Sequence, residues 1–357
     1  MPTLHSPLTF RSGCTIQSRA VLAPMTNLQS HEDGSLGDDE LRWLRRRARG
    51  GFGLVETCAA FVTADGQAWP GQLGVHVDAM EPGLSRLASA VCEGGAAAIA
   101  QLFHGGARCP AELVGTPWSA CAGEISPGTR AGTEEDIART IRAFASAAAR
   151  AQRAGFTGVE VHGAHGYLPC QFLSRVHNTR QDDYGGSYAG RARFLREIVR
   201  AVRGVVGEEF CVGVRISLED FGQAVGMDLD EGLTLACELV TDGAEYIHAS
   251  LWDAARMSTK RPEFHPIGLL RAVLPSDVPL IVAGKIWSRA DADAALDRGA
   301  DAVAVGRAAI AHPEWPRGAV DPAYAPAEPP FSVEALRAAD LSPRFVEYMR
   351  RWKGFVA

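Results

Sequence analysis

The sequence lacks the features that direct a chain to a membrane or to nucleic acid. No apolar run approaches the ~20 residues that a membrane-spanning helix needs, and residues 1–10 contain neither the charged start nor the apolar core of a signal peptide. Acidic and basic residues are mixed along the chain to a net charge of -6, which leaves no basic face or polybasic tail. We therefore expect a cytoplasmic protein whose partners are small molecules or, in a homo-oligomer, further copies of itself.

Patterns typical of metal binding are also missing. The 8 cysteines are scattered, with no Cys-x-x-Cys pair and no spacing typical of zinc or of an iron–sulfur cluster. Reduced and mostly structural thiols are expected, and no metal is predicted.

The chain does contain short apolar runs that alternate with segments of helical periodicity. These runs occupy residues 19–25, 52–57, 97–102, 159–161, 210–216, 246–249, 280–283 and 302–305. The clearest helix follows the capping-box sequence Thr133-Glu134-Glu135-Asp136 and continues to Gly155. Nearly continuous apolar strands that alternate with helices favour a parallel barrel over an open sheet. We predict an α/β fold, a single-domain (β/α)8 TIM barrel with terminal extensions. The barrel covers 1–315, and residues 316–357 pack on it or on a neighbouring subunit.

One strand leads directly into a group of proton-sharing side chains. The apolar run Val159 to Val161 is followed among glycines by His162, His165 and Tyr167. Catalytic side chains of such barrels gather at the C-terminal ends of the strands, where this group could grip a carbonyl or nitro oxygen and return a proton. The two histidines could instead ligate zinc, or could be buried structural residues.

Residues after other strands suggest a planar cofactor with an anionic tail. Gly284-Lys285 and Gly306-Arg307 follow the last two strands, where such barrels commonly hold a phosphate, although glycines there could simply turn strand into helix. Arg215 could stabilise negative charge on a cofactor or pair with Glu219 or Asp220. Gln101 ends another run, where its amide could hydrogen-bond a heteroaromatic ring.

Several longer motifs follow one another in a recognisable order. They are Ala23-Pro24-Met25-Thr26, Gln101-Leu102-Phe103-His104-Gly105-Gly106, His162 to Leu168, Phe172-Leu173-Ser174, Asn178 and Asp183-Tyr184-Gly185-Gly186-Ser187. By these motifs the chain, from about Leu8 to Pro313, resembles the old yellow enzyme family of FMN-dependent ene-reductases.

This resemblance implies a role for each residue that matches a family motif. Tyr167 would donate the proton, and His162 and His165 would bind the substrate's carbonyl oxygen. The residues expected to contact FMN are Pro24, Met25, Thr26 and Thr57 at the ring, Gln101 and Arg215 at its pyrimidine side, and Ala283, Gly284, Lys285, Gly306 and Arg307 at the phosphate.

Three departures from the family pattern bear on substrate binding and redox control. Thr26 stands where one branch has a flavin-tuning cysteine, Leu28 replaces a tyrosine of the substrate pocket, and the familiar Gly-Arg pair is displaced to Gly106-Ala107-Arg108. Arg350-Arg351-Trp352 could reach a neighbouring subunit's site or form an exposed tail helix.

The iron–sulfur cluster and second nucleotide-binding domain of larger members are missing, so NADH or NADPH is the expected reductant. The expected function is ping-pong reduction of activated C=C bonds in α,β-unsaturated carbonyl or nitro compounds. The alternatives are substrate oxidation, demethylation or nitro reduction on the same flavin, and a non-catalytic flavin-binding redox sensor.

Overall fold

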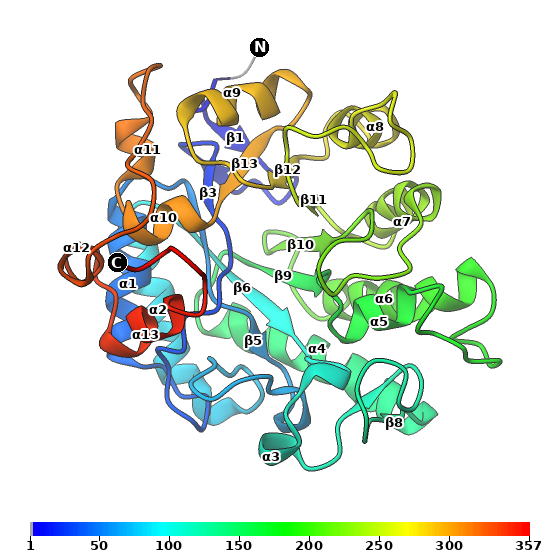
Figure 1. Ribbon diagram of the computed structural model, residues 1–357. Coiled ribbons are helices and arrows are strands. Elements are labelled where there is room, and N and C mark those ends of the chain that lie inside the picture. The colour runs from blue at the N-terminus through cyan, green and yellow to red at the C-terminus, as the bar shows by residue number, and fades with distance from the viewer. Residues whose placement is uncertain (1–2) are drawn as a thin grey trace.

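The computed structural model describes residues 3–357, so residues 1 and 2 of the predicted domain 1–315 lie outside the described residues. The described chain forms a closed parallel barrel surrounded by helices (Figure 1). The barrel strands are β3 (Ala20–Leu22), β4 (Leu54–Glu56), β6 (Ala97–Phe103), β9 (Gly158–Gly163), β10 (Cys211–Ile216), β11 (Tyr246–Ser250), β12 (Leu280–Ala283) and β13 (Ala302–Val305). Strand β3 pairs with both β13 and β4, and β4 pairs with β6, which closes the sheet. The predicted (β/α)8 barrel is confirmed, and each predicted apolar run coincides with or overlaps one of its strands.

Helices connect successive strands and cover the outside of the barrel. The connecting helices are α1 (Asp38–Arg49), α2 (Glu81–Cys92), α4 (Glu134–Arg153), α6 (Tyr188–Arg203), α7 (Leu229–Thr241), α8 (Pro266–Val273) and α9 (Arg289–Asp297), and α10 (Arg307–Ala311) follows the last strand. Thr133 and Asp136 form the predicted capping box at the start of α4, each side chain bonding the other's backbone N–H. In residues 3–357, each helix is too short or too polar to cross a membrane.

Shorter elements lie in the loops and at the two ends of the chain. They are β1 (Leu8–Thr9), β2 (Thr15–Ile16), β5 (Ala60–Phe61), η1 (Ala64–Gly66), η2 (Asp78–Met80), η3 (Gly106–Arg108), α3 (Ala111–Val114), β7 (Trp118–Ser119), β8 (Arg130–Ala131), α5 (Leu168–Leu173), α11 (Trp315–Gly318), α12 (Val333–Ala338) and α13 (Pro343–Met349). The hairpin of β1 and β2 places Phe10 and Ile16 against the buried first residues of the strands, including Tyr246. The N-terminal end of the barrel is therefore closed by apolar packing.

The barrel interior changes from apolar to polar along the strands. Side chains alternate between the two faces of a strand, so Tyr246, His248 and Ser250 of β11 share its inner face. Ile281 and Ala302 belong to the apolar end of the interior, whereas Glu56, Glu160 and Arg215 form its polar end. The polar end is the C-terminal end, where the loops after the strands also converge.

The C-terminal segment packs against the first helix of the barrel (Figure 1). The Phe345 ring on α13 meets the Trp43 ring on α1 edge-on, with the ring centres 5.6 Å apart. The Arg47 guanidinium lies 4.2 Å from the centre of the Trp43 ring and donates a 2.8 Å hydrogen bond to the Ala339 carbonyl. These contacts hold α13 beside the mouth of the barrel.

Candidate active site

Three polar side chains lie at one level of neighbouring strands. His162 of β9 is in register with Arg215 of β10, which is in register with His248 of β11. Each follows an outward-facing apolar residue, so the alternation of the strand directs all three into the barrel. The polar side chains at the end of β9 therefore belong to a polar layer that also includes residues of β10 and β11.

The turn after β9 places His165 and Tyr167 beside His162. His165 has φ of 60° and Gly166 has φ of 72°, so two successive residues adopt left-handed backbone. A Cβ at Gly166 would lie 2.1 Å from the Gln223 carbonyl oxygen, so only glycine fits there. The His165 N–H donates a 3.1 Å hydrogen bond to Ser217 Oγ, which holds the unusual backbone in place.

The Ala164 N–H fixes the tautomer of His162, and the hydrogen bonds of this structure are then satisfied by one tautomer of His165. The Ala164 N–H donates to His162 Nδ1 at 3.3 Å, so the proton of this ring is on Nε2. His162 Nε2–H then donates to His165 Nδ1 at 3.1 Å, and His165 Nε2–H donates to Ser250 Oγ at 2.7 Å. Arg215 also donates to Ser250 Oγ, at 3.1 Å. Ser250, which the sequence analysis did not single out, thus connects the histidine pair to Arg215.

Burial keeps the histidines neutral and the phenol protonated. Burial, reinforced by the positive charge of Arg215, lowers the pKa of His162 to about 3 and lowers the pKa of His165 well below its ordinary value. Burial also raises the pKa of Tyr167. At neutral pH the group therefore offers neutral N–H donors and a phenolic proton.

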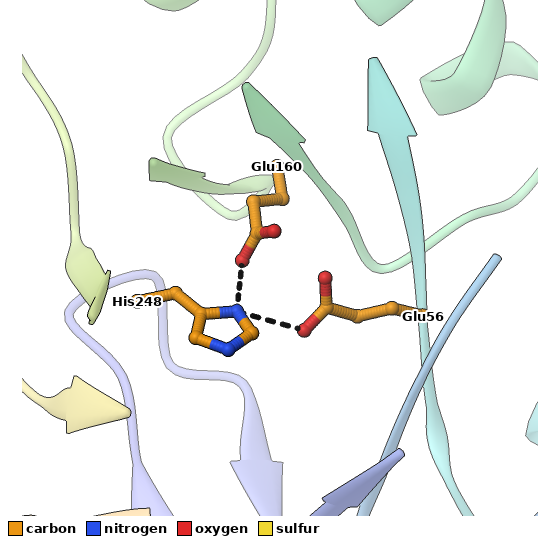
Figure 2. A group of neighbouring side chains, drawn as sticks. All are labelled: Glu56, Glu160 and His248. Atoms are coloured by element: carbon orange, nitrogen blue, oxygen red, sulfur yellow. Dashed lines mark hydrogen bonds and ion pairs between the residues drawn. The ribbon is translucent and has the colours of Figure 1, made fainter. Parts of the chain in front are cut away.

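A buried cluster of charges lies among the same strands (Figure 2). His248 Nδ1 is 2.9 Å from Glu160 Oε2 and 3.3 Å from Glu56 Oε1, and all three side chains are fully buried. Burial and then the neighbouring Glu160 carboxylate raise the pKa of Glu56. Burial opposes ionisation of Glu160, but the His248 charge, hydrogen bonds with His248 and Glu56 and the Arg215 charge together outweigh burial and lower its pKa. The cluster therefore places its negative charge on Glu160, between two cations.

The same cluster positions Gln101. Gln101 Nε2 donates a 2.7 Å hydrogen bond to Glu160 Oε1, which fixes the amide of the residue predicted to bond the flavin. The three buried side chains also form a potential metal-ligand set, with ligand atoms within 4.8 Å of one another. In this structure His248 Nδ1 and Glu160 bond each other directly, as in a buried ion pair.

A large cavity opens at the C-terminal end of the barrel. It has a volume of about 740 Å³, within the usual range for a cofactor site. Of the predicted cofactor residues, its lining includes Pro24, Met25, Thr26, Arg215, Ala283, Gly284, Lys285, Gly306 and Arg307. Of the predicted proton-sharing residues it includes His165. Residues separated by most of the chain therefore meet around one space.

The lining fits a flavin mononucleotide. A Cβ at Gly306 would stand 3.7 Å from Met25 Sδ and 4.0 Å from the Ala23 methyl, both of which line the cavity. In the described chain, buried Arg215 Nε has no hydrogen-bond partner, so it can donate to a ligand. Lys285 and Arg307 supply positive charge at one end, although Lys285 Nζ is also 3.2 Å from Asp253 Oδ2. A planar group over Arg215 with a phosphate near these cations matches this arrangement.

The remaining predicted residues lie beside this cavity. Thr57 is buried, and its hydroxyl donates to the Cys58 carbonyl at 2.7 Å and accepts from the Gln101 N–H at 3.1 Å. Leu28 and Tyr167 line a second chamber of about 750 Å³, called the outer chamber below. It shares Thr26 and Tyr348 with the cofactor cavity. The two chambers are therefore adjacent and have common walls.

Some residues of the site were missed or left open in the sequence analysis. The Arg108 guanidinium lies 4.2 Å from the centre of the Tyr167 ring and donates to the His165 carbonyl at 2.8 Å. Arg350 and Arg351 line the outer chamber of their own chain, and Trp352 lines the cofactor cavity with 51% of its surface exposed. Glu160 lies two positions before His162, so both side chains face the same side of the strand. This spacing was the signal in the sequence that could have identified Glu160.

A parallel barrel whose cavity is lined by cations and lies beside two imidazoles and a phenol is typical of a flavin-dependent oxidoreductase. Residues 3–321 match the model of the NADH:flavin oxidoreductase / NADH oxidase family, and the chain belongs to this family. Its structure is similar to those of old yellow enzyme homologues, and the chain belongs to the old yellow enzyme family.

The chain is similar to several characterised or solved members. It is 39% identical over 322 residues to the probable NADH-dependent flavin oxidoreductase YqiG of Bacillus subtilis (strain 168), covering 87% of this chain and 86% of that one. The old yellow enzyme homologue from Zymomonas mobilis superposes with a TM-score of 0.82 and 27% identity, covering 94% and 96% of the two chains. Morphinone reductase in complex with tetrahydroNAD gives a TM-score of 0.82 and 28% identity, covering 94% of each chain. The protein is an NAD(P)H-dependent oxidoreductase with FMN as its cofactor.

Proposed function

We propose that the protein reduces the activated C=C bond of α,β-unsaturated carbonyl or nitro compounds in a ping-pong cycle with NADH or NADPH. The observation that carries this proposal is the group of His162, His165 and Tyr167 beside the cofactor cavity. Bound FMN would supply the redox chemistry, accepting a hydride from the nicotinamide and passing it to the β-carbon of the alkene. The protein's own residues would bind the substrate oxygen and supply the proton.

The histidine pair would hold the substrate's oxygen. His162 Nε2 and His165 Nδ1 face each other at 3.1 Å, so one oxygen beside them can reach both. His162 Nε2 already carries a proton, and His165 donates from Nδ1 when the Ser250 hydroxyl donates to its Nε2 instead of accepting from it. Two neutral donors in a buried site then stabilise the negative charge that develops on the oxygen.

Tyr167 would protonate the α-carbon. Its ring stands edge-on to the His162 ring with the centres 5.2 Å apart, and to the Phe103 ring with the centres 4.4 Å apart. These contacts orient the phenol, and burial keeps it protonated at neutral pH. The Arg108 guanidinium over the ring would stabilise the phenolate left by proton transfer.

The remaining predicted residues would hold the flavin. Pro24, Met25 and Thr26 would border its ring, with Thr57 buried behind them. Gln101 and Arg215 would bond its pyrimidine edge. The phosphate would be held by the backbone at Ala283, Gly284 and Gly306 and by the charges of Lys285 and Arg307.

Two half-reactions test this function. The holoenzyme is bleached anaerobically with NADH, and recolouring is then followed after addition of cyclohexenone. In the variant with both His162→Ala and His165→Ala, we expect bleaching to remain and recolouring to slow at least about 10²-fold, because one such donor is worth about 10²–10³-fold. Tyr167→Phe should slow recolouring by about 10²–10⁴-fold, the usual contribution of a general acid.

The exposed His31 provides a matched control, because His31→Ala removes a histidine outside the site. Rapid recolouring by the double histidine variant would refute the assigned roles. A wild-type flavin that NADH bleaches but no enone recolours would instead indicate a redox sensor or another reaction.

A further inference from the structure

The outer chamber beside the proposed active site is rich in positive charge. Its lining includes Arg108, Arg344, Arg350 and Arg351, whereas Glu347 is its one acidic residue in the described chain. This local excess contrasts with the net charge of -6 of the whole chain. A hollow lined by charges of one sign concentrates ligands of the opposite sign.

Three of these guanidinium groups have no acidic partner. Arg350 pairs with Glu347, its Nε 3.3 Å from the carboxylate oxygen, and so occupies that acid. Within residues 3–357, Arg108, Arg344 and Arg351 form no ion pair with a carboxylate. Other arginines do pair, as Arg150 does with Asp78 at 2.6 Å. The chamber therefore carries three guanidinium charges that no carboxylate of the described chain neutralises.

The chamber is placed to receive the distal part of a ligand. Tyr167 lines it, with the Arg108 guanidinium 4.2 Å from the centre of the phenol ring. Thr26 and Tyr348 line both the chamber and the cofactor cavity, and the Arg351 guanidinium is 5.6 Å from the Tyr348 ring centre. A ligand that reacts beside Tyr167 can thus extend from the flavin toward Arg344 and Arg351.

We propose that Arg108, Arg344 and Arg351 form an anion-binding subsite for a carboxylate or phosphate carried by the ligand that reacts at the flavin. Guanidinium groups suit this purpose because their planar forks bond both oxygens of such groups. The subsite rests on the proposed function for its position relative to the reaction. The anion belongs either to an unsaturated substrate with a carboxylate or to the phosphates of the nicotinamide coenzyme.

The substrate arm of the test compares benzoylacrylate with its methyl ester on the holoenzyme. Both are enones with the same ketone, and only the acid carries a charge on the far side of the double bond. We expect the ratio of kcat/KM for acid over ester to fall about tenfold in Arg344→Gln and in Arg351→Gln, mainly through KM, because a hydrogen bond to a charged group contributes at least about that factor. Arg337→Gln is the matched control, since it removes an exposed arginine of α12 outside the chamber and should leave this ratio unchanged.

The coenzyme arm follows anaerobic bleaching of the flavin by NADPH and by NADH. Loss of the preference for one coenzyme in the Arg344 and Arg351 variants, with the acid-to-ester ratio unchanged, would assign the anion to a coenzyme phosphate. Loss of the acid preference alone would assign it to the substrate. If neither ratio changes in either variant, the subsite is refuted.

A binding measurement separates this inference from the proposed function. The oxidised holoenzyme is titrated calorimetrically with benzoylacrylate without coenzyme, so no turnover is needed. Binding that weakens about tenfold in the two variants and not in Arg337→Gln supports the subsite even if no alkene is ever reduced. Equal binding of acid and ester by the wild type, together with an absence of coenzyme preference, refutes it.

Discussion

Protonation of His162 should contribute strongly to the loss of stability in acid. The side chain is 3% exposed, and burial and then the nearby Arg215 charge lower its pKa to about 3 from an ordinary 6.5. The folded protein therefore resists binding a proton that the unfolded chain accepts. The stability that the neutral ring provides is fully present above pH 6.5 and is lost as the pH falls from 6.5 toward 3.

The size of this loss follows from the two pKa values. A separation of 3.5 units, 6.5 minus 3, corresponds to about 5 kcal/mol once the pH is below both values. At pH 4.5 the unfolded chain is almost fully protonated at this position and the folded protein is almost not. The loss at that pH relative to neutral is therefore about 3 kcal/mol.

Urea unfolding of the wild type and of His162→Asn, at saturating FMN and at several pH values, measures this loss. Asparagine stays neutral, so the stability difference between the two proteins should shift in favour of the variant by about 3 kcal/mol between pH 7.5 and pH 4.5. His31→Asn controls for loss of a histidine at an exposed position. A difference that is constant over this pH range would refute the assignment of a buried, neutral His162.

Two further predictions concern the packing and charge of the barrel interior. Glu160→Gln leaves His248 and Arg215 without their negative partner and should lower the free energy of unfolding by about 3–5 kcal/mol, and His248→Gln in the same chain should recover part of it. Thermal unfolding at fixed FMN concentration measures both, and an unchanged midpoint for Glu160→Gln would contradict the buried pair. Gly213→Ala places a Cβ 1.9 Å from Tyr246 Cζ, which should cost at least about 1–3 kcal/mol by the same assay. Adding Tyr246→Leu should restore stability, whereas a single variant as stable as the wild type would show that the ring moves freely aside.

The order of strands and helices was predictable because barrel strands buried on both faces read as continuous apolar runs. Glu160 and His248 were not recognised, since each is a single polar residue inside such a run. Their meaning depends on register: β9, β10 and β11 must pair before His162, Arg215 and His248 become neighbours. A single sequence contains the inward alternation of each strand but not the stagger between strands.

Long-range packing explains why the sequence did not determine where the residues near the C-terminus lie. The position of Arg351 and Trp352 depends on α13 docking on α1 through Phe345 and Trp43, a contact between the two ends of the chain. Local patterns do not report such a contact. By contrast, the His162 to Tyr167 turn is specified by adjacent residues, and the structure brings these side chains together as the sequence indicated.

The distribution of charge from the centre of the barrel outward gives each layer a different chemical capacity. In the innermost layer the Glu160 carboxylate is the shared negative partner of Arg215 and His248, so neither buried cation is left without an anion nearby. Beside the cavity, His162, His165 and Tyr167 are neutral donors, which can stabilise a charge that forms during the reaction without binding an ion beforehand. The outer layer holds the unpaired guanidinium groups, which can bind an anion that exists before the reaction begins. Because an anion bound at the histidines would occupy the position of the substrate oxygen, this separation allows a charged ligand to enter with its neutral, reactive end directed at the flavin.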